Sequence, residues 1–308
     1  MKVLIGFDGS DCSKGAIRDL QKAGLPADTE AMVLSVAEMF VYMTSPVAAG
    51  MAAASPQDMP LTVRRLRAFA AEAMAEARAT ATEGVELVKT LFPGWKASCE
   101  STTDTASWAL INKAGEWHAD LVVVGSHGRS ALGRMFLGSV SQQVLGHSPC
   151  SVRVSRCAET VQHLQTTPPK LILAIDGSAD SAAAVEAVML RTWPAGTEVR
   201  IVTAVDLKML GMLPVFGFDD AVQDEDPTGK FRRRADTVVE ELREVGLSAV
   251  SVVTVGDPKR VLLDEAEEWG ADCIFLGAKG HSRIDKVLLG SVSAAVAARA
   301  LCSVEVVR

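Results

Sequence analysis

The sequence contains few aromatic residues and no apolar run long enough to cross a membrane. Phe, Trp and Tyr make up 5% of the 308 residues, so the core is expected to consist of Val, Leu, Ile and Ala. A membrane-spanning helix needs about 20 consecutive apolar residues. The closest run, 41–54, is shorter and is interrupted by Thr44, Ser45, Pro46 and Gly50. A membrane protein is therefore not expected.

The chain also lacks a surplus of positive charge, a leader segment and paired cysteines. Its net charge is −7 and its pI is about 5.4, which argues against a nucleic-acid partner. Residues 1–8 lead directly into a strand pattern without the apolar region of a signal peptide, so the cytoplasm is the expected location. The absence of a Cys-x-x-Cys pair favours free thiols over a metal site. The six cysteines are Cys12, Cys99, Cys150, Cys157, Cys273 and Cys302.

An internal repeat divides the chain into two halves. The tripeptide Asp-Gly-Ser follows an apolar run at Asp8 and again, 168 positions later, at Asp176. Gly125 recurs as Gly277, 152 positions later, so the first half carries 16 additional residues. The Met- and Ala-rich segment 39–61, with the helix after it, is the expected place for them. A repeat of this length predicts duplicated domains rather than a solenoid.

Both halves show the same alternation of strand and helix patterns. This alternation predicts an α/β fold of two tandem five-stranded parallel sheets, each with helices on both faces. The domains are expected at 1–155 and 170–308, joined by a linker over 156–169. Strands are expected at 2–8, 31–36, 96–101, 121–124, 151–155, 170–176, 198–205, 249–255, 272–276 and 303–307. Helices are expected at 11–23, 62–89, 106–117, 139–146, 180–191, 229–245, 258–269 and 291–300.

A glycine loop follows the fourth strand of each half. The first copy reads Gly125-Ser-His-Gly128, then nine residues, then Gly138-Ser139. Glycines let the backbone approach an anion closely, and the helix that starts after Gly138 offers free N–H groups to a phosphate. Ser139 and Ser141 add hydroxyl donors. The second copy has the same spacing, at Gly277, Gly280, Gly290, Ser291 and Ser293. The sequence therefore predicts two phosphate-binding loops at the carboxyl ends of parallel strands.

Asp8 and Asp176 end the first strand of each half, at the same edge of the sheet as the loops. A carboxylate at this position is well placed to contact a ligand. Asp-Gly-Ser is also favourable turn chemistry that caps the following helix. Ligand contact is the favoured interpretation.

Basic side chains stand at equivalent positions in the two loops. His127 corresponds to Lys279, and Arg129 corresponds to His281. They are compatible with phosphate neutralisation, and solvated loop residues are an equal alternative. We call each glycine loop, together with the Asp-Gly-Ser turn of its half, a cradle. The sequence thus predicts the same backbone cradle twice, with unequal affinity or occupancy for the ligand.

The Gly-x-x-Gly, nine-residue, Gly-Ser pattern after an apolar strand, combined with the aspartate that ends strand one, resembles the nucleotide-binding signature of the universal stress protein family. The resemblance covers both halves, so the chain looks like a tandem, two-domain member. It implies a Rossmann-like, adenine nucleotide alpha hydrolase-like fold and a role in a stress response. It also implies ATP, with or without Mg²⁺, as the bound cofactor.

The resemblance further implies roles for individual residues. Asp8 and Asp176 would lie near the adenosine, and the backbone of Val36 and Ala204 would contact the adenine. The loop glycines and serines would hold the ribose and the phosphates. The valines between the serines belong to the same set; they are Val140 and Val292.

A nucleotide-dependent sensor or regulator is the favoured function. The alternatives are a slow ATPase, or another ATP-using enzyme of the same fold, and a scaffold with vestigial sites. Asp8-Gly-Ser-Asp-Cys-Ser13 lacks the double glycine of an ATP pyrophosphatase loop, and the chain has neither a Walker loop nor a His-Ile-Gly-His signature. These absences favour binding over turnover.

The strands that close the two halves, 151–155 and 303–307, are expected at sheet edges, and such edges invite pairing. By resemblance, these edges mediate dimerisation in the family. In a tandem chain they can pair within one molecule or join two copies into a homodimer. The sequence leaves both open.

Overall fold

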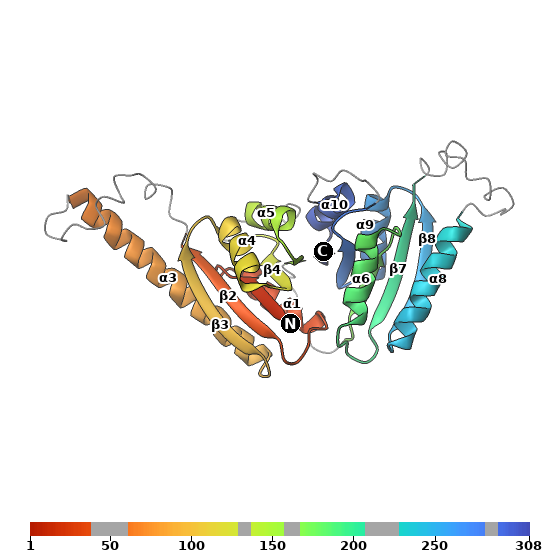
Figure 1. Ribbon diagram of the computed structural model, residues 1–308, viewed down its shortest axis with the longest axis horizontal. Coiled ribbons are helices and arrows are strands. Elements are labelled where there is room, and N and C mark those ends of the chain that lie inside the picture. Colours follow the sequence, from red (N-terminus) through yellow and green to blue (C-terminus); the bar gives the residue numbers. More distant parts are fainter. Residues whose placement is uncertain (38–60, 129–136, 157–166, 207–227, 281–288) are drawn as a thin grey trace.

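The structure is a computed structural model of the chain, and it describes residues 1–37, 61–128, 137–156, 167–206, 228–280 and 289–308. Two α/β lobes lie side by side, one for each half of the sequence (Figure 1). Most of the segment 39–61 that was expected to be inserted lies outside the described residues, as do Arg129 and His281.

Within the described residues, ten strands form one continuous sheet. They are β1 (Lys2–Gly6), β2 (Glu30–Ala37), β3 (Lys96–Thr103), β4 (Leu121–Gly125), β5 (Ser151–Ser155), β6 (Lys170–Ala174), β7 (Glu198–Val205), β8 (Ser248–Val255), β9 (Cys273–Gly277) and β10 (Ser303–Val307). Their order is β3-β2-β1-β4-β5-β10-β9-β6-β7-β8. All pairs within each half are parallel, so the predicted five parallel strands in each half are confirmed. The two sets join into one sheet through β5 and β10.

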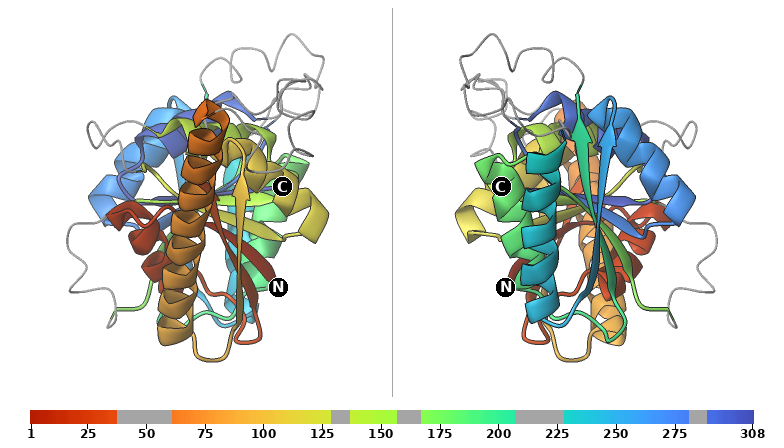
Figure 2. Two further views of the ribbon diagram at one scale, coloured as in Figure 1. Left: turned by 90° about the vertical axis from the view of Figure 1, so that its left-hand side faces the viewer. Right: turned by 90° about the vertical axis from the view of Figure 1, so that its right-hand side faces the viewer.

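Helices cover both faces of each half. The first half has α1 (Asp11–Asp19), α3 (Leu61–Leu91), α4 (Ala106–Trp117) and α5 (Ser139–His147), and the second has α6 (Ala179–Met189), α8 (Gly229–Glu244), α9 (Pro258–Trp269) and α10 (Ser291–Arg299). In end view, α3 lies across the outside of the first half and α8 across the outside of the second (Figure 2). The helix expected over 11–23 is shorter, because after α1 the chain forms a 3₁₀ turn, η1 (Leu20–Lys22).

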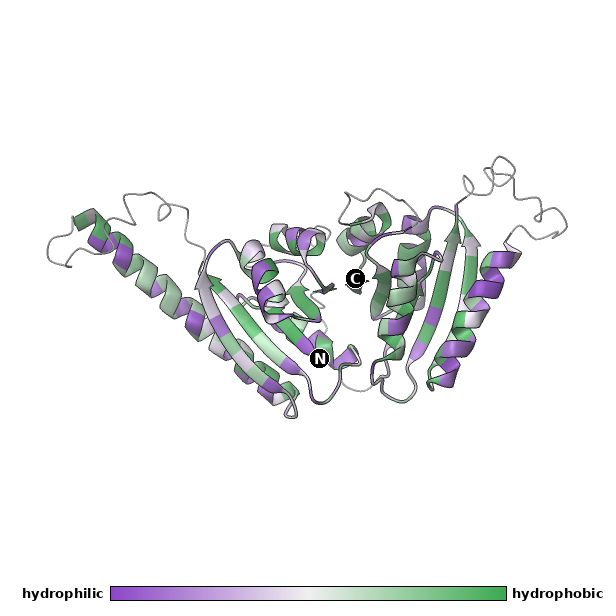
Figure 3. Ribbon diagram, viewed as in Figure 1, coloured by the Kyte–Doolittle hydropathy of each residue, from purple (hydrophilic) through white to green (hydrophobic). Residues whose placement is uncertain are grey.

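The strands are apolar because helices bury them on both faces. Val3, Leu4 and Ile5 of β1 have no exposed surface. Figure 3 shows the inner strands as mainly hydrophobic and the outer helix α8 as mainly hydrophilic. No helix in the described ranges is long and apolar enough to span a membrane.

The core is continuous across the two halves on one face only. On the side of α4, α5, α9 and α10, one apolar cluster contains residues from both halves, including Val152, Val154, Val304 and Val306. On the side of α1, α3, α6 and α8, each half has a cluster of its own. The side chains of β5 and β10 that face this second side include buried Arg153 and Glu305.

The two closing strands pair with each other. β5 and β10 are antiparallel, with Val304 opposite Val154 and Val306 opposite Val152. Each closing strand therefore has a neighbour on both sides, β4 and β10 for β5, and β9 and β5 for β10. The pairing within one molecule is the arrangement observed. In the part of the chain that the structure describes, the strands at the two ends of the sheet are β3 and β8. A homodimer stays a prediction.

The cysteines depart from the sequence expectation at one position. Cys12 is disulfide-bonded, whereas free thiols were expected throughout. The free cysteines among the described residues are Cys99, Cys150, Cys273 and Cys302. Burial raises the pKa of the Cys302 thiol to about 12, so that thiol stays protonated near neutral pH.

A tight contact between the halves leads to a stability prediction. Gly24 has φ +63°, and a Cβ there would lie 2.7 Å from the Trp193 ring. We expect Gly24→Ala to lower the free energy of unfolding by about 2–4 kcal/mol, because strained backbone and overpacking add. Gly246 also has positive φ, but a Cβ there would meet nothing within 4 Å. Gly246→Ala should lower the free energy of unfolding, measured in urea, by only about 1 kcal/mol. Equal losses in the two variants would contradict the effect of the contact between Gly24 and Trp193.

Candidate functional site

Asp8 lies just beyond the carboxyl end of β1, where its carboxylate organises a turn. The backbone N–H and the hydroxyl of Ser10 donate to Asp8 Oδ1, at 3.0 and 2.6 Å. Ser10 in turn caps α1 by accepting a hydrogen bond from Ser13 N at 3.2 Å. Gly9 between them has φ +79°, which glycine adopts readily. One carboxylate oxygen thus shapes the turn.

The second oxygen of Asp8 faces the glycine loop. A Cβ added at Gly128 would lie 2.9 Å from Asp8 Oδ2. The same approach recurs in the second half, where a Cβ at Gly280 would lie 2.7 Å from Asp176 Oδ2. The glycines therefore permit a backbone-to-carboxylate contact that any side chain would obstruct. Both the turn role and a position beside the loop hold for these aspartates.

The second turn repeats the first. Ser178 N donates to Asp176 Oδ1 at 2.9 Å, and Ser181 N donates to Ser178 Oγ at 3.2 Å. Gly177 has φ +87°. The helices that follow, α1 and α6, start in the same way because the two sequences carry the same turn chemistry.

The loops return to their strands before the next helix begins. Gly138 N donates to Ser126 O at 2.8 Å, and Gly290 N donates to Ala278 O at 2.7 Å. Gly138 and Gly290 are the residues that precede α5 and α10, and neither has a side chain to cap the helix. The first-turn N–H groups therefore have no capping side chain from these residues, which leaves the helix N-terminus suited to an anion.

The predicted serines separate into two kinds. Ser141 Oγ donates to Gly125 O at 2.6 Å, and Ser293 Oγ donates to Gly277 O at 2.7 Å. These two hydroxyls are buried and fasten α5 and α10 to their strands. The two serines that begin the helices are exposed; they are Ser139 and Ser291.

The strand-end glycines lie against the helices. A Cβ at Gly125 would lie 3.0 Å from the backbone of Cys12, and a Cβ at Gly277 would lie 2.5 Å from the backbone of Asp180. These glycines bring β4 close to α1 and β9 close to α6. The fold therefore requires these glycines for packing, in addition to any approach to a ligand.

The remaining predicted contacts occupy matching places in both halves. Val36 and Ala204 are each the last residue but one of β2 and β7, and both are half-buried. Val140 and Val292 lie in the first turns of α5 and α10. All these positions lie at the carboxyl ends of the parallel strands, as expected for an α/β site.

The basic loop residues differ between the halves. His127 is half-buried, and its Nδ1 shares a hydrogen bond with the Ser126 hydroxyl at 3.1 Å. Lys279 is exposed, and its backbone N–H donates to Asp180 Oδ2 at 2.8 Å. The two cradles have the same backbone arrangement, but the basic side chain is half-buried in the first and exposed in the second. Among the described residues, no cluster of three His, Cys, Asp or Glu side chains is arranged to hold a metal ion.

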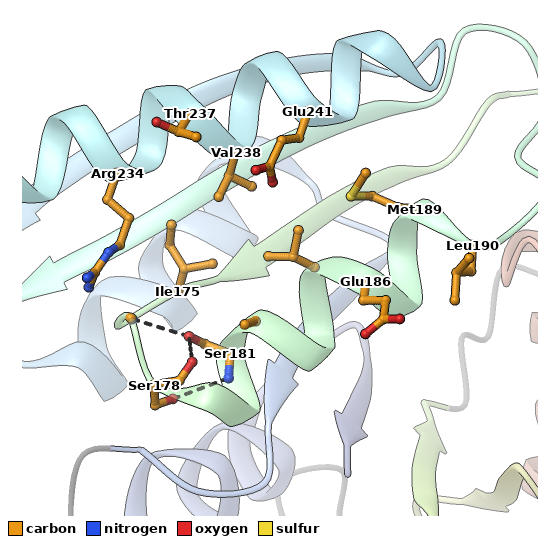
Figure 4. A pocket seen from close by; sticks show the side chains of 13 residues that line it. Ile175, Ser178, Ser181, Glu186, Met189, Leu190, Arg234, Thr237, Val238 and Glu241 are labelled. Carbon is orange, nitrogen blue, oxygen red and sulfur yellow. Dashed lines mark hydrogen bonds between the residues drawn. The ribbon is translucent and has the colours of Figure 1, made fainter.

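Sequence reasoning missed Arg234 beside the second turn. A Cβ at Gly177 would lie 1.6 Å from Arg234 Nη1, so the guanidinium rests on this glycine. Arg234 stands at one end of a groove of about 640 Å³ between α6 and α8 (Figure 4). In the first half, Lys14 on α1 instead pairs with Glu83 on α3 at 2.8 Å. Arg234 is brought to the Gly177 turn by the packing of α8, a helix remote in sequence. No spacing in the sequence indicates this contact.

The strand order, the paired turns and the loop-to-helix cradles define a tandem α/β protein with the adenine nucleotide alpha hydrolase-like fold. The sequence model of the Universal stress protein family matches residues 1–156 and, a second time, residues 169–308. The chain belongs to the universal stress protein family, and it carries two copies of the domain.

Relatives and solved structures agree with this assignment. A universal stress protein of Mycobacterium tuberculosis is 33% identical over 178 residues, 58% of each chain. One of Mycolicibacterium smegmatis is 30% identical over 191 residues, 62% of each chain. The aligned segments thus span about three fifths of these relatives. The crystal structure of a universal stress protein from Archaeoglobus fulgidus covers 100% of this chain and 96% of its own, with a TM-score of 0.64 and 21% identity, and shows the same fold.

The two kinds of serine lead to a second prediction. We expect Ser141→Ala to lower the free energy of unfolding by about 1–2 kcal/mol, because it removes a buried donor from the Gly125 carbonyl. Ser139→Ala, two positions away and exposed, should change it by less than about 0.5 kcal/mol. Urea unfolding followed by circular dichroism measures both. Equal effects of the two substitutions would contradict the fastening role.

Proposed function

We propose that this protein binds adenine nucleotide, as ATP, at one site in each half, and acts as a nucleotide-dependent regulator in a stress response. The observation that carries the proposal is the duplicated cradle. In each half a glycine approaches an aspartate carboxylate, and the helix that follows begins without a capping side chain. The expected cytoplasmic location is part of the same proposal.

The cradle fits the chemistry of a nucleotide. Helix first-turn N–H groups and the exposed Ser139 and Ser291 hydroxyls are donors for phosphate oxygens. The Oδ2 atoms of Asp8 and Asp176, which lie beside the loop glycines Gly128 and Gly280, are acceptors for the polar groups of the adenosine. The penultimate residues of β2 and β7 offer backbone groups to the adenine. No ligand set for Mg²⁺ stands out among the described residues, so we propose that any Mg²⁺ is held mainly by the phosphates.

Regulation by binding is favoured over turnover. One oxygen of each candidate aspartate accepts hydrogen bonds from the turn, which gives each carboxylate a structural role at the site. A nucleotide acts as a signal when its affinity differs between two states of the protein. The alternative, a slow ATPase, predicts phosphate release by the purified chain at rates above the uncatalysed reaction.

The first experiment asks whether the protein holds a nucleotide. The purified chain is denatured, and the released small molecules are separated and identified. Calorimetric titration of the nucleotide-free protein with ATP, AMP and a non-hydrolysable ATP analogue then gives affinity and stoichiometry. Absence of adenine nucleotide in the first assay together with absence of binding in the second would refute the proposal.

A pair of glycine substitutions tests whether there is one site in each half. Gly128→Ala and Gly280→Ala each place a methyl group against an aspartate carboxylate, so each should remove one site. We expect the stoichiometry of ATP binding to fall from two to one in either variant and to zero when both are combined. Gly146→Ala is the matched control, because a Cβ there meets nothing within 4 Å. Unchanged stoichiometry in both single variants would exclude the cradle as the binding site.

A further inference from the structure

The closing strands pair about a pseudo-two-fold axis. Arg153 of β5 lies opposite Glu305 of β10, and each flanking valine lies opposite a valine. Arg153 and Glu305 are 152 positions apart, the same spacing that relates Gly125 to Gly277, so they occupy the same place in their halves. The axis that relates the halves passes between these two residues.

The surroundings of the axis repeat on both sides. Arg156 Nη2 donates to Ala297 O at 2.6 Å, and Arg308 Nη2 donates to Leu145 O. The two arginines, and likewise the two carbonyls, are 152 positions apart. One contact is therefore made twice, once on each side of the axis. The backbone pairing and these two arginine contacts would therefore also allow two copies of β5, or two copies of β10, to pair across the axis.

The axis itself is not symmetric, because the equivalent residues carry opposite charges. Arg153 Nη1 lies 3.2 Å from Glu305 Oε2, and both side chains are completely buried. Arg153 Nε donates to Asp19 Oδ2 at 2.7 Å, and Arg191 pairs with both oxygens of Glu305. Four charges alternate in sign across the junction, two from each half.

The charges at the axis are maintained by their neighbours. Burial opposes the positive charge of Arg153, but the carboxylates of Asp19 and Glu305 outweigh burial, and the pKa of Arg153 lies well above its usual range. Neither Asp19 nor Arg191 has a charged counterpart in the other half, where Ala187 and Ala23 stand at the equivalent positions. The alternation is thus a property of this pair of halves and is not part of the repeat.

We propose that this alternation is a recognition code that makes β5 accept the β10 strand of this chain and reject a second copy of itself. Two β5 strands about the same axis would bring two guanidinium groups together in a completely buried site, and two β10 strands would bring two carboxylates together. Like charges in a buried site are strongly unfavourable. The surface therefore fits one partner, the other half of this chain.

The test exchanges the charges of one half at a time in the full-length protein. The first-half exchange combines Asp19→Lys with Arg153→Glu, and the second-half exchange combines Arg191→Glu with Glu305→Arg. Each keeps a charge pair inside its half and puts like charges at the axis. The combined exchange carries all four substitutions and restores opposite charges with reversed polarity.

Hydrogen exchange measured by mass spectrometry reports on the pairing directly. We expect amides of β5 and β10 to exchange at least about tenfold faster in either half exchange, and within about threefold of the unmodified chain in the combined exchange. Peptides from β1 and β6 serve as an internal reference and should not change. Arg260→Ala, which removes an exposed cation that pairs with Asp264 on its own helix away from the junction, is the control and should keep β5 and β10 protected.

A purely structural role of the buried charges gives different results. It predicts that the amides of β5 and β10 exchange at least as fast in the combined exchange as in the two half exchanges. That outcome overturns the proposal. Full protection of β5 and β10 in either half exchange overturns it as well. If a half exchange does not fold alone, the two are refolded together, because complementary axis charges then exist only between chains. A 1:1 dimer in analytical ultracentrifugation supports the proposal, and failure to form one overturns it.

Discussion

The antiparallel pairing of β5 with β10 is the interaction on which the rest of the structure depends. Without it, each half would end in a strand with a row of unpaired N–H and C=O groups, and exposed edges of this kind promote association with other chains. Pairing extends the sheet through both halves and joins their apolar side chains into a single layer beneath α4, α5, α9 and α10. The candidate sites lie at the ends of strands in the two halves that this junction joins.

The two faces of the junction contribute different things. On one face, four valines interdigitate, and burial of such side chains stabilises the fold by about 1.5–3 kcal/mol each. On the other face, Arg153 and Glu305 are removed from water, and the desolvation of buried ions offsets much of their attraction. An apolar pair would be at least as stable there. The retention of buried charges is therefore better explained by the choice of partner than by stability.

The sequence predicted the features that depend on local pattern. Alternating apolar runs and helical periodicities predicted the parallel sheets, and repeat spacing predicted two similar halves. The aspartates and glycines of each cradle could be assigned to the strand ends because turn chemistry and loop spacing are local. The path of the closing strands was left open, because a symmetric dimer and an intramolecular pair use the same strand edge.

Other features could not be predicted, for a physical reason that they share. Arg153 lies in a Ser-Val-Arg-Val-Ser pattern, which is typical of a strand with one polar face exposed. Its burial depends on Glu305 and Asp19, which are remote in sequence. Arg234 is recognised only from the packing of α8 against the turn at Gly177. Long-range pairing of charges leaves no periodic signal in a single sequence.

The junction also explains why two identical cradles need not behave identically. Each glycine loop is attached to the closing strand of its own half, through Ser126 N to Ser155 O at 2.9 Å and through Ala278 N to Val307 O at 2.8 Å. Ser155 also donates its hydroxyl to Asp19, a member of the charge network, at 2.8 Å. Val307, the equivalent residue, has no hydroxyl to donate. The first loop is therefore connected by hydrogen bonds to the axis charges, whereas the second is connected through backbone alone. The same backbone cradle is therefore supported differently in each half, and this difference at the axis adds to the difference between His127 and Lys279 in the loops.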